Sequence, residues 1–371
     1  MARSITLISG SPFAGCPIVY NVLPNTYDGD RTFHRVLLRV YARLEGDTAD
    51  TTFDFSQPVE TVASGQTYAT QPSQFDISSA LQAIAEKYEY TPEPPTRYPY
   101  IKFRIEAWDE WMVRGIVSPN QNVVKWPAQS NNGYEFYAYA FMGAFNDLER
   151  MNTQTDGNGV EYLNITNLSR KPLASPEIVF KSAPFIYPSV FASPGRSIGT
   201  TDSMVSGSFS SGAPADGPKS LSYTPSAVGT VTVGGHNIYA IDRPTNGYEL
   251  RFVNGMGCME SVCVTSKTKK EANIHTEKYT VSRRETLKKF SRTMTVKNDD
   301  KEVWVLVSGP LDEAWASWYV HEFLKAQLVW IKVGTLWIPC NVMPEETETI
   351  IDQEKAQMIK IQFRIELDLV Y

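Results

Sequence analysis

The chain has 371 residues, of which 42% are hydrophobic and 12% aromatic, so it can bury sizeable cores in two or three domains. This composition excludes a disordered protein. Lysine and arginine number 35 against 41 aspartates and glutamates, and the formal charge of −6 gives no overall attraction to nucleic acid or to an anionic membrane. The first residues lack the apolar run of a secretory signal, and no stretch approaches the roughly 20 apolar residues of a membrane-spanning helix. We therefore expect a soluble protein made in a cytoplasm.

The first predicted region, residues 1–185, is rich in β-strands. The stretch "FHRVLLRVYARL" alternates apolar side chains with three arginines, and "YIKFRIEAW" repeats the pattern. Between them, "DISSALQAIAEKY" has the apolar spacing of a short helix near residues 78–88, which Asp76 or Ser78 can cap. The prolines of "TPEPPT" end that helix.

The second predicted region, residues 186–247, begins with a stretch in which about half of the residues are Ser, Gly or Pro. Such a stretch buries little apolar surface, so it is a linker, a surface loop or an arm that a partner orders. Strand patterns return in "GTVTVGGHNIYAI", where Gly234 and Gly235 suit the turn of a hairpin.

The third predicted region, residues 248–371, combines strands with one helix. The helix, near residues 312–327, has an apolar stripe and Asp312 placed to cap it. The run "LVWIKVGTLWIPCNV" predicts a hairpin that turns at Gly334, and Met358–Tyr371 predicts one long strand with an apolar face. We predict a mainly β fold of two or more β-sandwich or half-barrel domains, the last with the helix laid across it.

The cysteines and histidines do not form the patterns of a metal site. The cysteines are scattered and are predicted to be free, mostly buried thiols, although four cysteines also allow disulfides. They are Cys16, Cys258, Cys263 and Cys340. The four histidines are isolated along the sequence. We therefore predict no metal and no cofactor.

Two stretches have residues typical of other sites. In "EAWDEWM", Asp109 and Glu110 lie between tryptophans as in sugar-binding clefts, but neighbouring residues of a strand point to opposite faces and cannot form one acid/base pair. In "TDGNGVEY", Asp156, Asn158 and Glu161 offer oxygen ligands for calcium, but the order differs from an EF-hand and fits a simple turn. The string "GMGCME" lacks the third glycine of a dinucleotide-binding motif.

Charges are unevenly distributed in the third region. Nine basic residues face three acidic ones between Lys267 and Arg292, whereas Glu345–Glu354 carries five acidic residues and no basic one. The two segments are either solvated faces of hairpins, complementary surfaces of neighbouring subunits, or, for the basic one, a DNA contact without the usual interleaved aromatics. The residues of the predicted subunit interface are Lys267, Lys269, Lys270, Arg283, Arg284, Lys288, Lys289, Arg292, Glu345, Glu346 and Glu348.

Several stretches resemble structural proteins from tail and baseplate regions of tailed phages and prophages of Bacteroidetes-type gut bacteria. In the third region they are "RFVNGMGCMESVCV", "VWVLVSGPLDEAWASWYVHEFLKAQLVWI", "WIPCNV" and "IKIQFRIELDLVY", and near the N-terminus they are "SGSPFAGCPIVYNV", "FHRVLLRVYARL" and "FDISSAL". The resemblance implies a tail-tube-like arrangement in which subunits join their sheets into a ring around a channel. It implies no catalytic residues.

We therefore predict a non-enzymatic structural subunit of a virion, a tail, baseplate or neck ring component around the DNA channel, assembled in the host cytoplasm. Its predicted partners are copies of itself in a homo-oligomeric ring and other virion proteins, with no membrane and with DNA contact at most indirect or through the channel. The alternatives are a carbohydrate-binding or adhesin-like receptor-binding β-protein, which the 8 tryptophans and 19 tyrosines favour, and a glycan-active enzyme.

Overall fold

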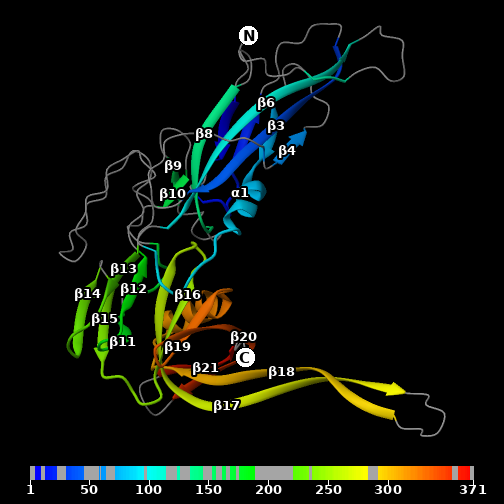
Figure 1. The fold of residues 1–371 in the computed structure, drawn as a ribbon. Helices are drawn as coiled ribbons and strands as arrows, with labels where there is room; N and C mark the ends of the chain where they lie inside the picture. The colour runs from blue at the N-terminus through cyan, green and yellow to red at the C-terminus, as the bar shows by residue number, and fades with distance from the viewer. Residues whose placement is uncertain are drawn as a thin grey trace. The chain divides into compact units, whose positions relative to one another are not determined.

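The structure is a computed structural model of the chain (Figure 1). The residues it describes are 5–9, 13–22, 31–45, 58, 60–63, 72–95, 98–113, 123–125, 134–144, 153–155, 161–163, 168–172, 175–188, 220–233, 236–282, 291–352 and 358–367. For part of these strands, including residues 271–282 and 291–301, only the backbone is described. Most of the Ser/Gly/Pro-rich stretch lies outside the described residues.

The chain divides into two compact units, each of which is described by itself. Unit 1 comprises Met1–Leu168, Pro188–Leu221 and Gly255–Cys258. Unit 2 comprises Ser169–Tyr187, Ser222–Asn254 and Met259–Tyr371. The units are discontinuous in sequence, so they cut across the three consecutive regions predicted above.

Unit 1 is built on a five-stranded antiparallel sheet (Figure 1). Its strand order is β4-β3-β6-β7, and β8 also pairs with β6. The strands are β3 (Arg31–Glu45), β4 (Glu60–Ala63), β6 (Tyr100–Val113), β7 (Val123–Lys125) and β8 (Tyr134–Phe141). A second sheet has the order β1-β2-β5 and a hairpin pairs β9 with β10. These strands are β1 (Ile5–Ser9), β2 (Val19–Val22), β5 (Ser73–Asp76), β9 (Thr153–Thr155) and β10 (Glu161–Leu163).

The core of unit 1 lies between its sheets and helix α1 (Ser78–Ala85). The alternation predicted for β3 is confirmed, since Val36, Leu38 and Val40 are fully buried. The short helix is also confirmed, but the predicted side-chain cap is wrong. The N-cap is Ile77, and the Asp76 carboxylate instead accepts a hydrogen bond from the backbone N–H of Ser78 at 2.9 Å.

The glycines of "GMGCME" lie where two stretches of unit 1 backbone come close together. Gly143 has a φ of +88°, and a Cβ on it would lie 2.1 Å from the carbonyl carbon of Met256. Gly257 has a φ of +75°, and the N–H of Ala144 donates to the carbonyl of Gly255 at 3.0 Å. Such backbone approach tolerates only glycine, which explains these glycines without a nucleotide.

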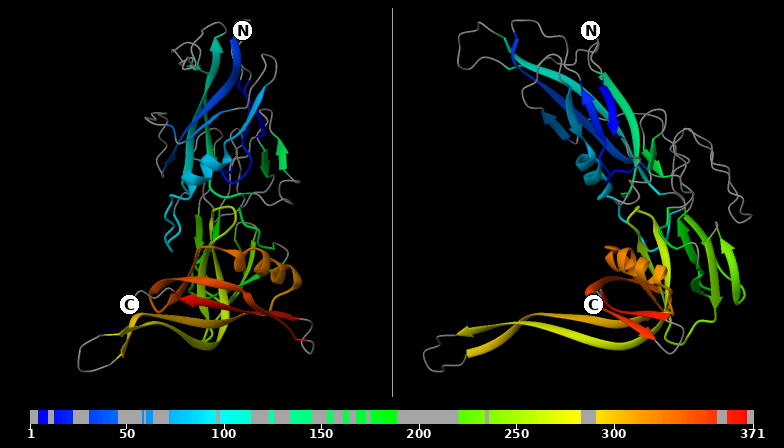
Figure 2. Two further views of the ribbon diagram at one scale, coloured as in Figure 1. Left: turned by 90° about the vertical axis from the view of Figure 1, so that its right-hand side faces the viewer. Right: turned by 180° about the vertical axis from the view of Figure 1, so that it is seen from behind.

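Unit 2 contains a closed six-stranded barrel of order β16-β17-β18-β21-β20-β19 (Figure 2). Its strands are β16 (Tyr248–Val253), β17 (Met259–Ser282), β18 (Ser291–Ser308), β19 (Val329–Val333), β20 (Leu336–Asp352) and β21 (Met358–Leu367). The predicted hairpin turn is confirmed: Gly334, between β19 and β20, has a φ of +64°. The mainly β fold is confirmed, and the C-terminal sheet closes fully into a barrel.

Smaller strands of unit 2 form a side sheet of order β11-β15-β14. Strand β11 (Glu177–Phe180) pairs in parallel with β15 (His236–Ile241), and β14 (Gly229–Val233) pairs with β15 as an antiparallel hairpin. The two paired strands of the predicted hairpin are therefore confirmed, and its predicted turn residues, Gly234 and Gly235, lie outside the described residues. A separate pair joins β12 (Phe185–Pro188) to β13 (Ser220–Tyr223).

Helix α3 (Glu313–His321) and the 3-10 turn η2 (Phe323–Lys325) contribute to the barrel core. The predicted cap is confirmed, because the Asp312 carboxylate accepts a hydrogen bond from the N–H of Trp315 at 2.9 Å. Trp315 and Trp318 pack edge to face with ring centroids 5.3 Å apart, and Phe252 lies 5.8 Å from Trp318. The helix thus supplies the aromatic part of the core.

Candidate functional site

Two hairpins of unit 2 extend beyond the barrel. Strands β17 and β18 stay paired out to Ser282 and Ser291, and we call the part of this hairpin from Lys267 to Lys301 the basic arm. Strands β20 and β21 stay paired out to Asp352 and Met358, and we call residues 344–361 of this hairpin the acidic arm. The arms contain the oppositely charged segments found in the sequence.

The two arms leave the barrel at opposite ends of the β18–β21 pair. These strands are antiparallel, with Glu302 opposite Leu367 and Val307 opposite Gln362. Strand β18 continues from Glu302 toward Ser291, past the described end of β21, whereas β21 continues from Gln362 toward its start in the other direction. Figure 2 shows the two hairpins pointing to opposite sides of the barrel.

The outer edges of the arms have no strand partner among the described residues except at Ile359 of the acidic arm, which exchanges two backbone hydrogen bonds with Leu311 at 2.8 and 3.0 Å. Strand β16 pairs with β17 only as far as Val264, and β21 pairs with β18 only as far as Glu302. The barrel itself is closed, so it offers no free edge. Among the barrel strands, the backbone N–H and C=O groups available for pairing with another strand therefore lie on the arms.

A cluster of charged and aromatic side chains fixes the root of the basic arm. The Lys267 ammonium lies 3.7 Å from the ring centroid of Trp304 and 5.2 Å from that of Tyr248. The Lys270 ammonium lies 2.7 Å from the carboxylate of Glu302, which also accepts a hydrogen bond from the Trp304 indole. Burial alone raises the pKa of Glu302, but these hydrogen bonds outweigh it and lower the pKa.

Two bulges in β17 twist the basic arm at its root. Thr265 and Thr268 are extra residues without a facing partner on β18. Their hydroxyls donate instead to the carbonyls of Ser308 and Val305, at 3.2 and 3.4 Å. Bulges bend a strand and increase its twist, so they set the direction in which the arm leaves the barrel.

The acidic arm begins with a wide irregularity in β20. Met343 and Glu348 both pair with β21, but residues 344–347 between them face the single residue Phe363. Pro344 has no N–H to donate to a ladder, which explains why regular pairing stops there. Two of the predicted acidic interface residues lie in this bulge.

The predicted interface residues are only partly described. Lys267 and Lys270 have the contacts within the chain given above, and Lys269 is exposed on the same strand. Arg283, Arg284, Lys288 and Lys289 lie outside the described residues, and the backbone alone is described for Arg292, Glu345, Glu346 and Glu348. Their role in an interface stays a prediction.

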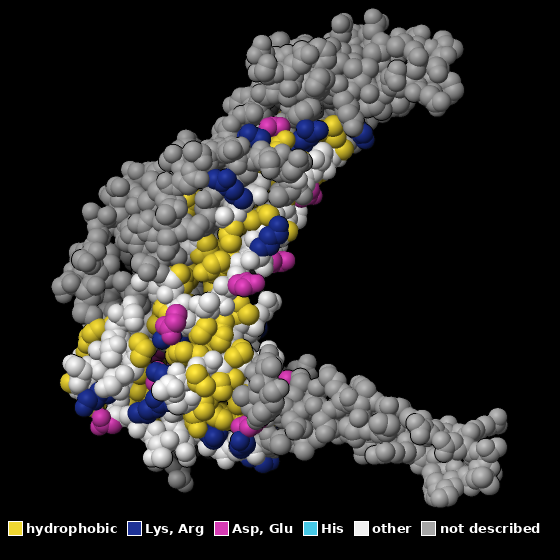
Figure 3. All heavy atoms as spheres, viewed as in Figure 1, with side chains coloured by type: hydrophobic (Ala, Val, Ile, Leu, Met, Phe, Trp, Pro, Cys, Tyr) yellow, Lys and Arg dark blue, Asp and Glu magenta, His cyan; other side chains and the backbone are white. Residues whose placement is uncertain are grey.

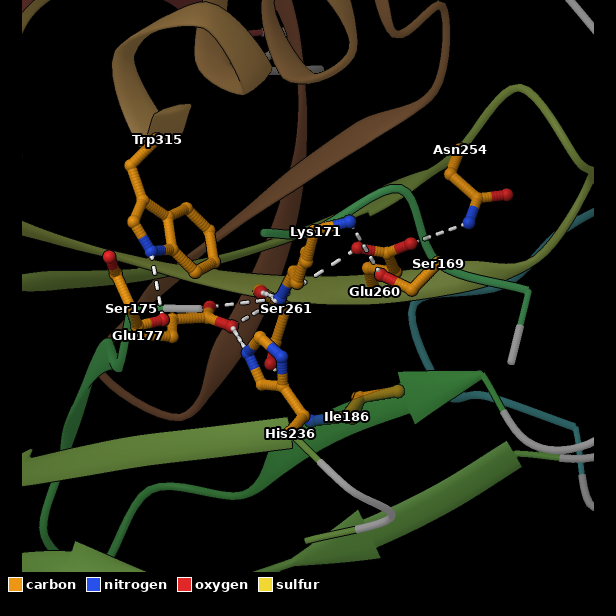
Figure 4. Close-up of polar contacts among 10 residues, drawn as sticks. All are labelled: Ser169, Lys171, Ser175, Glu177, Ile186, His236, Asn254, Glu260, Ser261 and Trp315. Carbon is orange, nitrogen blue, oxygen red and sulfur yellow. Dashed lines mark hydrogen bonds and ion pairs between the residues drawn. The ribbon is translucent and has the colours of Figure 1, made fainter. Parts of the chain in front are cut away.

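A second chemically distinctive place is a buried polar cluster beside the barrel core (Figure 4). The Lys171 ammonium, fully buried, lies 2.8 Å from both carboxylate oxygens of Glu177 and 2.6 Å from the carbonyl oxygen of Ser261. Nε2 of His236 lies 3.2 Å from the same Glu177 carboxylate. Glu177 therefore connects a lysine and a histidine away from water.

Glu260 completes this cluster from strand β17. Its Oε1 accepts a hydrogen bond from the Asn254 amide at 2.5 Å, and its Oε2 lies 3.7 Å from the Lys171 ammonium. Burial raises the pKa of Glu260 to about 7, although Lys171 and Asn254 act to lower it. The negative charges of Glu322 and Glu177 also contribute to the raised pKa of Glu260. We call Lys171, Glu177, His236, Asn254, Glu260 and Ser261 the buried cluster.

Further polar contacts connect the segment that carries Lys171 to helix α3. The Arg170 guanidinium binds the Glu322 carboxylate through two hydrogen bonds of 2.8 and 3.0 Å. The Trp315 indole donates to the carbonyl of Ser175 at 3.2 Å. Because the cluster side chains are at most 7% exposed, they contact the barrel, the side sheet and the helix rather than solvent.

Sequence reasoning missed the buried cluster. The sequence contained one indication of it. Alternate residues of a strand share a face, so Glu260 lies on the same face of β17 as Val262 and Val264, whose side chains point into the barrel core. An acidic residue at a core position of a strand predicts a buried partner. The identity of that partner does not follow from the sequence, since Lys171 and His236 lie on distant segments.

The enzyme-like sequence "EAWDEWM" forms part of β6. Asp109 pairs with Val36 and Glu110 with Arg35 on β3, so they are consecutive residues of one strand, as predicted. Their side chains are not described.

Asp156 and Asn158 lie outside the described residues, and Glu161 begins β10 of the β9–β10 hairpin. No group of three His, Cys, Asp or Glu residues that could hold a metal occurs in the described part of the chain. The four cysteines are free, as predicted, and all but Cys263 are buried.

The described surface adds no further site. Figure 3 shows hydrophobic atoms over the α3 region of unit 2, where Val320 and Leu328 are 37% and 42% exposed. Scattered apolar residues of this kind are usual on protein surfaces. Among the described helices, none is long and apolar enough to cross a membrane.

Three chains of solved structures are similar to this chain. No family model and no curated protein matches the sequence. A chain from the structure described as "Tail of empty GTA particle computed with helical refinement, C6 symmetry" aligns with 33% of this chain and with 92% of its own length. The sequence identity is 8% and the TM-score is 0.21, too low to establish a shared fold or function.

Proposed function

We propose that this chain is a non-enzymatic structural subunit of a phage virion, a tail, baseplate or neck component whose copies join through their arms. The observation that carries the proposal is the pair of oppositely charged hairpins at opposite ends of one closed barrel. In the proposed contact, the basic arm of one copy binds the acidic arm of the next copy.

Charge complementarity supports this contact. The basic arm has nine basic and three acidic residues between Lys267 and Arg292. The acidic arm has five acidic residues and no basic one between Glu345 and Glu354. Opposed potentials speed association and fix the register of two surfaces. The two arms of one barrel point away from each other, so such a contact is satisfied between copies.

The contact is heterologous, because a different surface is used on each side. Heterologous contacts generate closed rings if the rotation between copies closes, and filaments if it does not. The unpaired arm edges provide the means, since an exposed strand edge can accept a strand from a neighbour. A ring of this kind around a DNA path is the arrangement we propose.

The carbohydrate-binding alternative gains no specific support from the described residues. Its motivation was the tryptophan content, and four of the described tryptophans are at most 7% exposed in the unit 2 core or strands: Trp304, Trp315, Trp318 and Trp330. Trp337 is partly exposed, and its ring lies 4.1 Å from the Arg251 guanidinium. These rings pack against the protein's own side chains.

Sedimentation velocity of single-arm variants tests the proposal. Reversing three charges of the basic arm with Lys288→Glu, Lys289→Glu and Arg292→Glu should weaken self-association more than about tenfold at low salt. High salt should reduce the association of the wild-type chain as well, because exposed charges are screened.

The matched control reverses two exposed lysines outside the arms, Lys87→Glu and Lys325→Glu. This variant should associate like the wild-type chain. A monomeric wild-type chain at low salt, or an arm reversal that leaves association unchanged, would contradict the proposal.

A further inference from the structure

We propose that the buried cluster is a proton-dependent clasp: with one bound proton it holds the side sheet and the Lys171 segment against the barrel, and without that proton it loosens. This inference is independent of the proposed assembly. It stands on the composition of the cluster, the distances between its groups and their exclusion from water.

The charges of the cluster and its neighbours balance only when one extra proton is present. Two cations, Lys171 and Arg170, face three carboxylates, those of Glu177, Glu260 and Glu322. His236 adds a positive charge only when it is protonated. With three ionised carboxylates and a neutral imidazole the net charge is negative, and one proton on Glu260 or His236 cancels it. An uncompensated buried charge is strongly destabilising.

Among the described residues, Cys263 of β17 and Tyr319 of α3 also interact with the charges of the cluster, and neither supplies the missing positive charge. Burial raises the pKa of the Cys263 thiol to about 12 and raises the pKa of the Tyr319 phenol well above its usual value, so both are neutral. Asn254 and Ser261 are uncharged. The balance therefore depends on the proton of Glu260.

The position of the cluster gives the proton a structural effect. Lys171 and Glu177 belong to the segment that leads into β11, and His236 begins β15, so both strands of the parallel pair in the side sheet are attached here. Glu260 and Ser261 belong to barrel strand β17. Ionisation of Glu260 adds a second buried carboxylate beside a lysine that is already paired with Glu177, and the cost of burying this charge, together with its repulsion from Glu177, weakens this attachment.

The sign of the pH dependence follows from the pKa of Glu260. It is raised from 4.5 to about 7 in the folded chain, so the folded state holds this proton more tightly than the unfolded state. Its contribution to stability is fully present below pH 4.5, falls as the pH rises, and is lost as the pH passes 7. Unfolding near pH 6 should therefore release a proton from this site.

Calorimetric unfolding of the full chain at pH 6, in buffers of different ionisation enthalpy, counts the protons released. We expect the wild-type chain to release about one proton more than Glu260→Gln, which imitates the protonated acid. The variant should have a higher Tm than the wild-type chain at pH 8 and a similar one at pH 4.5. Equal proton release by the two chains would overturn the proposal.

The matched control is Glu249→Gln, because Glu249 is also buried but its carboxylate is compensated by Arg243 and Lys332, 2.9 and 3.4 Å away. This control should keep the extra proton release of the wild-type chain.

A second measurement needs no variant. Amide hydrogen exchange of β11 and β15, corrected for intrinsic rates, should accelerate between pH 6 and pH 8 relative to the barrel strands β16 and β19. Equal protection at both pH values would show that the proton does not act on the clasp.

Discussion

At the scale of single residues, the ion pair between Lys171 and Glu177 is a buried contact on which the stability of unit 2 depends. Both side chains are almost fully excluded from water, and Lys171 donates to both oxygens of Glu177. A buried pair of this kind adds little stability over an apolar pair, but the removal of one partner leaves a buried charge uncompensated.

Lys171→Met should therefore lower the free energy of unfolding by about 3–5 kcal/mol, measured by urea denaturation. The double variant Lys171→Met, Glu177→Gln should recover part of this loss, because no charge then remains unpaired between the two positions. A double variant that is less stable than Lys171→Met alone would show that the ion pair is not the cause.

Gly143 is a residue of unit 1 where backbone conformation and space both demand glycine. Gly143→Ala should lower the free energy of unfolding by roughly 2–4 kcal/mol, since its φ is +88° and the added Cβ would lie 2.1 Å from the backbone of Met256. Gly334→Ala is the control, because its φ is +64° but nothing lies within 4 Å of the added atom. The control should lose only about 1–2 kcal/mol, and equal losses would contradict the steric account.

At the scale of elements, helix α3 was predictable from sequence because its determinants are local. Asp312 precedes the apolar stripe by the spacing of an N-cap, and its carboxylate accepts the bond from Trp315 N–H that such a cap makes. The Gly334 turn was predictable for the same reason, as glycine tolerates the positive φ that a tight hairpin needs.

Asp312→Ala should lower the free energy of unfolding by about 1 kcal/mol, because the N–H of Trp315 loses its acceptor at the helix start. Asp312→Asn keeps a side-chain oxygen and should stay within a few tenths of the wild-type value. Thermal unfolding of the two variants and the wild-type chain at one pH measures the difference. If both variants were equally destabilised, the lost charge rather than the cap would be responsible.

Other features of the fold were not predictable from local patterns. Barrel closure depends on β16 pairing with β19, and these strands are far apart in the sequence. The start of β11 pairs with β15 across the Ser/Gly/Pro-rich stretch, which has no pattern that indicates a partner. The buried cluster was missed for the same reason, since Glu260 alone indicates that some partner exists but not that it is Lys171.

At the scale of the whole molecule, the proposed assembly depends on the two arms of unit 2. The sequence predicts a basic and an acidic segment, and the strand register adds that they leave the barrel in opposite directions. That geometry disfavours a contact between the two arms of one chain. It favours a contact between chains, in which each copy uses both arms.

The most direct test is a mixing experiment with two variants. One carries Arg283→Glu, Arg284→Glu, Lys288→Glu, Lys289→Glu and Arg292→Glu, which leave four basic and eight acidic residues between Lys267 and Arg292, so both of its arms are acidic. The other carries Glu345→Lys, Glu346→Lys and Glu348→Lys, which leave two acidic and three basic residues between Glu345 and Glu354, so both of its arms are basic. Sedimentation velocity at low salt should find each variant unassociated alone and find mixed assemblies in an equimolar mixture, because every contact then joins opposite charges. Variants that associate alone as the wild-type chain does, or a mixture that stays unassociated, would contradict the arm-to-arm contact.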